Sequence, residues 1–164
     1  MRRQSFKITA MFVSTTYDKY SYLNDPNIPK FDPNIHLLVM DGNCALCSRG
    51  ARIISALDRK NQFRITPVNT RLGMALLTHY GFDPTSPDSW LYITNGQAYS
   101  SLDAIIRVAS TCSIWGNLLR PLRGLPNSWQ NWLYQCIAKN RYHLFGHTDI
   151  CAIPDKKLQD RLLK

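Results

Sequence analysis

Two cysteines follow directly after an apolar run that ends abruptly at a polar turn. The run His36–Met40 is short and rich in strand-forming residues, and Asp41-Gly42 ends it, which predicts a buried strand. From about Ala45 to Lys60 apolar residues recur at helical spacing, and Leu46, Ile53, Ile54 and Leu57 are predicted to share one face. The pair Cys44 and Cys47 is therefore expected at the N-terminus of a helix.

Further elements follow at short intervals. We expect, in order, a strand at 63–68, a helix at 71–80 that Gly81 closes, strands at 90–94 and 98–100 joined by an Asn95-Gly96 hairpin turn, and a helix at 102–111. Pro67 indicates that the second strand lies at a sheet edge or ends there. The order strand, helix, strand, helix, strand, strand, helix predicts an α/β fold of thioredoxin-like topology. An apolar helical segment from Trp115 to Phe145 is expected to be added after it.

The size and composition fit one globular domain. A chain of 164 residues with 45% hydrophobic content can bury a core without disulfides. Residues 1–34, punctuated near their end by three prolines, are expected to be an extension that is partly disordered or lies as a strap on the domain. Residues 35–155 form the predicted domain, and 156–164 a C-terminal tail.

The charge pattern and the cysteine count bear on where in the cell the protein is expected and on which partners it could bind. Five cysteines cannot all pair, and they are too scattered for a disulfide framework. No apolar region follows Arg2-Arg3, and no run approaches the roughly 18 apolar residues that span a bilayer. These features favour the cytoplasm. The net charge of +9 suits acidic partners, but the chain lacks a Lys/Arg run of five, so we expect no nucleic-acid partner.

A dithiol at this spacing can carry disulfide exchange. Cys44 is the expected attacking thiolate, because unpaired N–H groups and the helix dipole at a helix N-terminus stabilise negative charge. Cys47 is the expected resolving thiol. Gly42 would let the chain turn sharply and leave Cys44 open to a bulky partner. Asp41 either relays a proton near Cys47 or caps the turn, and the spacing favours the cap.

Other interpretations of the dithiol remain open. Cys44 and Cys47 could be a buried structural pair or half of a zinc site in a non-catalytic binding module. His143, His147 and Cys151 are spaced four apart and could join a soft-metal site, but the spacing matches no tight pattern, and we expect no metal and no cofactor. Cys112 and Cys136 are predicted to lie in the core. Cys151 is either a third redox thiol or a buried small residue, and burial is favoured.

The segment from Val39 to Gly50, VMDGNCALCSRG, resembles the signature of the DCC family, thiol-disulfide oxidoreductases named for an Asp-Cys-Cys motif. Ser101-Leu102-Asp103-Ala104 resembles the start of that family's last core helix. Its C-terminal pattern is similar to Tyr134, Ala138, Asn140-Arg141-Tyr142, Phe145-Gly146, Cys151 and Pro154. The similarity spans about residues 36 to 155. It implies a thioredoxin-like fold and exchange with a disulfide-containing protein or a glutathione-like thiol.

The resemblance and the fold suggest further site residues. Thioredoxin-like enzymes carry a cis-proline before the third strand, and Pro87 lies near that position, although Asp88 and Ser89 intervene. Ser101 and Asp103 are candidate substrate contacts from the second motif. Arg141 could bind an anion such as a glutathione carboxylate or belong to a structural hydrogen-bond cluster.

The segment from Trp129 to Phe145 mixes aromatic and basic residues. An aromatic stripe at helical spacing most often packs in a core, which we favour here. The alternative is contact with a membrane surface or a partner.

Overall fold

The computed structural model describes residues 17–85 and 90–163. Its centre is a sheet of β1 (His36–Met40), β2 (Phe63–Pro67), β3 (Leu91–Thr94) and β4 (Gln97–Tyr99), in the spatial order β2-β1-β3-β4. β1 pairs with β2 in parallel, whereas β3 is antiparallel to both β1 and β4. With α2 (Ala45–Leu57), α3 (Arg71–His79) and α4 (Ser101–Cys112) the predicted order is complete, and the fold is thioredoxin-like.

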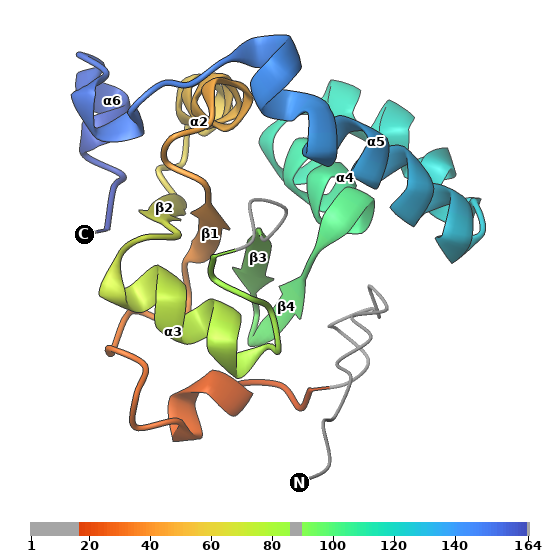
Figure 1. Ribbon diagram of the computed structural model, residues 1–164. Coiled ribbons are helices and arrows are strands. Elements are labelled where there is room, and N and C mark those ends of the chain that lie inside the picture. The colour runs from red at the N-terminus through yellow and green to blue at the C-terminus, as the bar shows by residue number, and fades with distance from the viewer. Residues whose placement is uncertain (1–16, 86–89, 164) are drawn as a thin grey trace, which may run out of the picture.

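Both faces of the sheet are covered. Leu37 and Val39 point into a cluster with Leu76 of α3, and Leu38 and Met40 point into a second cluster on the opposite face. Alternate residues of β1 thus enter two cores, as the continuous apolar run predicts for a strand buried on both sides. In Figure 1, α3 covers one face, and α2 and α4 cover the other.

The face of α2 that packs on the sheet differs from the predicted one. Ala45, Ser48, Ala51 and Ser55 are buried, whereas Ile53 and Leu57 are exposed. Small side chains at the buried positions let the helix approach the sheet closely, and the larger Ile53 and Leu57 turn toward solvent. The predicted apolar face was therefore wrong for Ile53 and Leu57, whereas Ile54 packs partly buried against the core and the helix itself is confirmed.

The hairpin turn is confirmed at Asn95-Gly96. Both residues have positive φ angles, 49° and 76°, as a two-residue turn between twisted strands requires. Tyr20 packs directly on Gly96, where an added Cβ would lie 2.5 Å from the ring, and its N–H donates to the Gly96 carbonyl at 2.7 Å. Only glycine fits both the turn and this contact.

The described part of the N-terminal extension packs on the domain. The short helix η1 (Ser21–Asn24) contributes Tyr22, which lies wholly buried in the core beneath α3, and Ile28 is buried there too. Figure 1 shows this segment passing below α3. Residues 17–34 therefore lie along the domain and cover part of one core, whereas 1–16 lie outside the described residues.

The chain after α4 is helical, as expected. It forms η2 (Ile114–Gly124), α5 (Asn127–Phe145), η3 (Ile150–Ala152) and α6 (Lys156–Gln159). α5 lies across α4 in Figure 1, and its C-terminal end approaches α2. In the described ranges, 17–85 and 90–163, no helix is long and apolar enough to cross a membrane.

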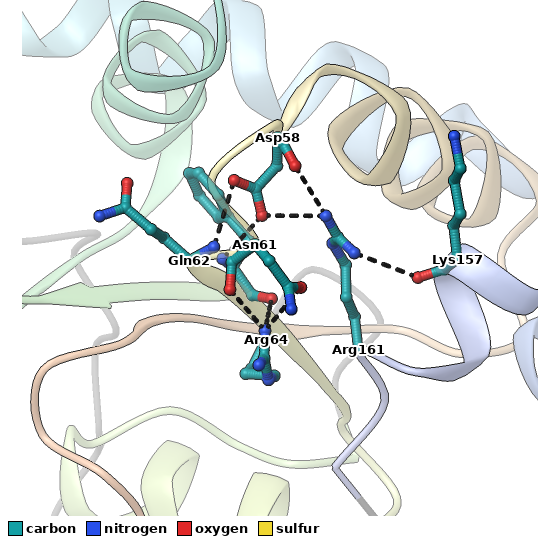
Figure 2. Close-up of polar contacts among 7 residues, drawn as sticks. Asp58, Asn61, Gln62, Arg64, Lys157 and Arg161 are labelled. Atoms are coloured by element: carbon teal, nitrogen blue, oxygen red, sulfur yellow. Dashed lines mark hydrogen bonds and ion pairs between the residues drawn. The ribbon is translucent and has the colours of Figure 1, made fainter.

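The C-terminal residues are anchored by a buried ion pair. Arg161 lies 3.2 Å from the Asp58 carboxylate and donates to the Asp58 carbonyl at 2.8 Å (Figure 2). The same carboxylate accepts N–H bonds from Gln62 and Phe63, at the turn that leads into β2. Backbone bonds between Ile65 and residues 161 and 163 then extend the sheet edge. Residues 161–163 thus cover the edge of β2, and Pro67 correctly indicated that β2 is an edge strand.

Candidate functional site: a covered dithiol

Cys44 occupies the N-cap of α2. Its backbone is extended, with φ −93° and ψ 121°, and its Sγ accepts a hydrogen bond from the Cys47 N–H at 3.5 Å. Cys47 lies in the first turn of the helix and is partly exposed. The helix therefore directs an unpaired N–H group at the first sulfur, which is the arrangement that stabilises negative charge there.

A backbone strap, residues 146–150, covers this dithiol. It forms a bridge between His147 and Cys44, and the N–H groups of Thr148 and Ile150 donate to the carbonyls of Asn43 and Gly42 at 3.0 and 2.8 Å. Cys44 is wholly buried as a result. The expectation that Cys44 lies open to a bulky partner was wrong, because the chain after α5 folds back over it.

Gly42 serves close packing in this loop. A Cβ added there would lie 3.1 Å from Ile150 Cγ2 and 3.2 Å from Pro67 Cβ. Its φ angle is not positive, so the loop needs glycine for space and not for conformation. Gly42 thereby lets Ile150 of the strap pack directly against the backbone of the dithiol loop.

Asp41 links the dithiol loop to α5. Its Oδ1 accepts the Asn43 N–H at 2.8 Å, which caps the turn as the spacing favoured. Its Oδ2 accepts Arg141 Nη2 at 2.8 Å and the Tyr142 hydroxyl. Arg141 is buried, and its Nε has no hydrogen-bond partner among the described residues. The carboxylate is fully engaged, so its observed contacts are those of a cap and an anchor.

The two cysteines differ in their surroundings. Burial, followed by the neighbouring Cys44, raises the pKa of the Cys47 thiol to about 12, and the Arg141 charge works in the opposite direction. Cys47 is therefore a protonated thiol at neutral pH. Among the described residues that shift the Cys47 pKa, Arg141 is the cation.

An aromatic stack joins α5 to the strap. The Tyr142 and His147 rings lie 4.5 Å apart with an interplanar angle of 15°. Tyr142 also donates to Asp41, so one side chain contacts both the strap and the dithiol loop. The sequence left anion binding and a structural hydrogen-bond cluster open for Arg141, and its observed contacts are those of the cluster. The strap over the dithiol was not predicted.

The remaining predicted site residues lie apart from this cluster. In the sheet, Tyr99 of β4 pairs with Tyr92 of β3, which pairs with Leu38 of β1. Ser101, which follows β4, therefore lies at the same end of the sheet as the dithiol loop that follows β1, but two strands away. Asp103 instead turns along its own helix, where Arg107 Nε donates to it at 2.7 Å. Pro87 lies outside the described residues.

The other cysteines contradict part of the expected pattern. Cys112 packs partly buried against the core, but Cys136 and Cys151 are exposed, so the burial predicted for these two was wrong. His143 is exposed as well. Within the portion of the chain that the structure describes, no three His, Cys, Asp or Glu side chains form a group that could hold a metal ion.

A family model described as DCC1-like thiol-disulfide oxidoreductase matches residues 38–147. The match includes both cysteines, Asp41, Arg141 and the beginning of the strap. The chain belongs to this family. Membership confirms the resemblance that the segment from Val39 to Gly50 predicted, and it agrees with the thioredoxin-like sheet.

Two relatives extend the comparison. An uncharacterised Bacillus subtilis protein, YuxK, is 30% identical over 131 residues, which cover 80% of this chain and 95% of YuxK. A chloroplastic DCC family protein of Arabidopsis thaliana is 26% identical over 118 residues, or 71% of this chain and 69% of that protein. No solved structure matches the chain significantly.

Proposed function

We propose that the protein reduces disulfides through Cys44 and Cys47. The observation that carries this proposal is the N-cap position of Cys44, whose Sγ receives the Cys47 N–H at 3.5 Å. A sulfur at a helix N-terminus is stabilised as the thiolate, which is the nucleophile in disulfide exchange. Membership of a family named for thiol-disulfide oxidoreduction supports the same chemistry.

The exchange has two steps. The Cys44 thiolate attacks one sulfur of the substrate disulfide, so a mixed disulfide forms and the other substrate sulfur leaves as a thiolate that takes up a proton. Cys47 then loses its proton, attacks Cys44 Sγ, and releases the second substrate sulfur. The dithiol has given two electrons to the substrate and has become the Cys44–Cys47 disulfide. An external thiol must reduce it again.

The high pKa of Cys47 fits the resolving role. A thiol with a pKa of about 12 stays protonated at neutral pH and does not compete for the substrate. In the mixed disulfide the Cys44 sulfur is neutral, so one of the causes that raise the Cys47 pKa disappears. Cys47 thereby becomes a better nucleophile only after the first step.

Arg141 and Asp41 act as positioning residues in this account. Arg141 holds a positive charge near both sulfurs, and Asp41 fixes the guanidinium through a 2.8 Å hydrogen bond. These contacts favour the cap role of Asp41 over proton relay.

The strap sets the condition for substrate access. Cys44 is buried under residues 146–150, so those backbone bonds must open before a substrate sulfur reaches it. Disulfides of flexible protein segments and glutathione-like disulfides are the substrates that fit so covered a site. A cytoplasmic location, as the sequence predicts, would keep the dithiol reduced and favour this direction.

Burial of Cys44 is also the observation that favours a second candidate. A Cys-x-x-Cys pair whose first cysteine is wholly buried suits a binding module in which the dithiol only packs. Insulin reduction with dithiothreitol as the electron source separates the two. We expect turnover in the wild type and in Cys136→Ser, and its loss in Cys44→Ser. Equal background rates in all three folded proteins would favour the binding module.

A further inference from the structure

Large apolar side chains stand exposed on η2 and α5. Leu118 is 71% exposed, Trp129 65%, Trp132 63% and Leu144 68%. The preference for core packing of this stripe was therefore wrong. We define the helical surface as the exposed apolar side chains of these two helices: Leu118, Leu119, Leu122, Leu125, Trp129, Trp132, Ile137, Leu144 and Phe145. Exposure of this many large apolar side chains on two neighbouring helices marks an interaction surface.

The outer side of α5 is organised. Trp129, Trp132 and Cys136 recur at three- and four-residue spacing, and all three are exposed. Arg141, which lies on a different side of the helix, is buried against the dithiol loop. Figure 1 shows α5 as the outermost helix over α4. The tryptophans thus face away from the domain.

The charge of the same segment is one-sided. Between residues 104 and 148 the sequence has five Lys or Arg residues and neither Asp nor Glu. Arg107 on α4 pairs with Asp103, and the buried Arg141 pairs with Asp41. The cations of this stretch that remain for the surface are therefore Arg120, Arg123 and Lys139. All eleven acidic residues of the chain lie outside this stretch. Arg120, in the middle of η2, is exposed among the exposed leucines. An apolar surface with only positive charge is complementary to an apolar phase bordered by negative charge.

We propose that the helical surface binds an anionic phospholipid bilayer, lying on it without crossing it. Tryptophan is enriched at the level of lipid headgroups, where its apolar ring and its N–H are both satisfied. Each nearby cation adds attraction to anionic lipid. A second copy of the chain is a poorer occupant, because two copies of one basic surface would repel each other. This inference does not depend on the chemistry of the dithiol.

Vesicle co-sedimentation of the full chain tests the proposal. One set of vesicles is pure phosphatidylcholine, and the other contains one quarter phosphatidylglycerol. We expect binding to the anionic vesicles only, with affinity that falls as salt screens the charges. Trp129→Ser/Trp132→Ser should weaken binding by about tenfold or more. Arg120→Ala should weaken it about fivefold, the effect of one cation at a membrane surface.

Control variants remove similar exposed side chains that lie outside the helical surface. Leu23→Ser/Met74→Ser removes two exposed apolar side chains from η1 and α3, and Lys60→Ala removes an exposed cation after α2. Both should bind like the wild type. Because all the altered side chains are exposed, circular dichroism should show each variant folded.

Three results would overturn the proposal. The first is absence of sedimentation with anionic vesicles, and the second is binding that survives the tryptophan pair. The third is a dimer in light scattering that Trp129→Ser/Trp132→Ser dissociates, since the surface would then join copies of the chain.

Discussion

Arg141 donates a 2.8 Å hydrogen bond to Asp41, across 100 residues of sequence and from α5 to the loop before the dithiol. The arginine side chain is almost fully buried and the aspartate largely so. This pair fixes the added helical segment to the thioredoxin-like core at the point where the chemistry is expected. The Tyr142 hydroxyl, on the same carboxylate, extends the link to His147.

A double-mutant cycle on this pair should give a large coupling energy. Asp41→Asn leaves the Arg141 charge buried without a counter-ion, which should lower the free energy of unfolding by about 2–4 kcal/mol. Arg141→Met should have a similar cost, and the double variant should cost clearly less than the sum. Urea denaturation measures all four proteins. Strict additivity would show that the pair is not coupled.

The pH dependence of Cys47 alkylation follows from its raised pKa. Burial disfavours the thiolate, so its fraction stays small and grows about tenfold with each pH unit below the pKa of about 12. Site-resolved mass spectrometry should show an iodoacetamide rate at Cys47 that still rises tenfold from pH 8 to 9. A plateau there, as an ordinary thiol with a pKa near 8.5 would approach, contradicts the raised value. Cys44→Ser should lower the Cys47 pKa, because the neighbouring Cys44 is the second cause that raises it.

Loosening the strap should expose Cys44. Thr148→Pro removes the N–H that donates to the Asn43 carbonyl at 3.0 Å, whereas Thr148→Ala keeps it. One backbone hydrogen bond contributes about 1 kcal/mol, so the proline variant should alkylate at Cys44 roughly fivefold faster. The alanine variant should match the wild type. Equal rates in all three would mean that the strap does not control access.

The buried pair at the sheet edge should contribute strongly to stability. Arg161→Met leaves the Asp58 carboxylate, whose side chain is 4% exposed, without its cation, and should cost about 3 kcal/mol of unfolding free energy. Lys157→Met, an exposed neighbour on α6, is the control and should change stability by less than about 0.5 kcal/mol. A loss below about 1 kcal/mol for Arg161→Met would contradict a stabilising role.

Local patterns predicted the fold well. Each of three local features predicts one element: the run His36–Met40 predicts β1, the Asn95-Gly96 pair predicts the hairpin turn, and Pro67 predicts that β2 lies at the sheet edge. All three elements are present in the structure. The packed face of α2 did not follow. Helical spacing shows which residues share a side, but the close approach of helix and sheet selected Ala51 and Ser55 over Ile53.

The site was predictable only in part. Cys44 at the N-cap follows from a strand, a turn and a helix, all local in sequence. The strap that covers Cys44 and the Arg141–Asp41 contact join residues about 100 positions apart, and hydrophobic periodicity carries no information on such contacts. The exposure of Trp129 was missed for a related reason, because periodicity cannot tell an outer face from a core face.

The most direct test of the account is trapping with glutathione disulfide. In Cys47→Ser the mixed disulfide on Cys44 cannot be resolved, so mass spectrometry of the folded protein should find one glutathione on Cys44. The wild type should instead accumulate the Cys44–Cys47 disulfide. If Cys44 stays unmodified in Cys47→Ser while the exposed Cys136 and Cys151 react, Cys44 is not the attacking thiol and the proposed mechanism is wrong.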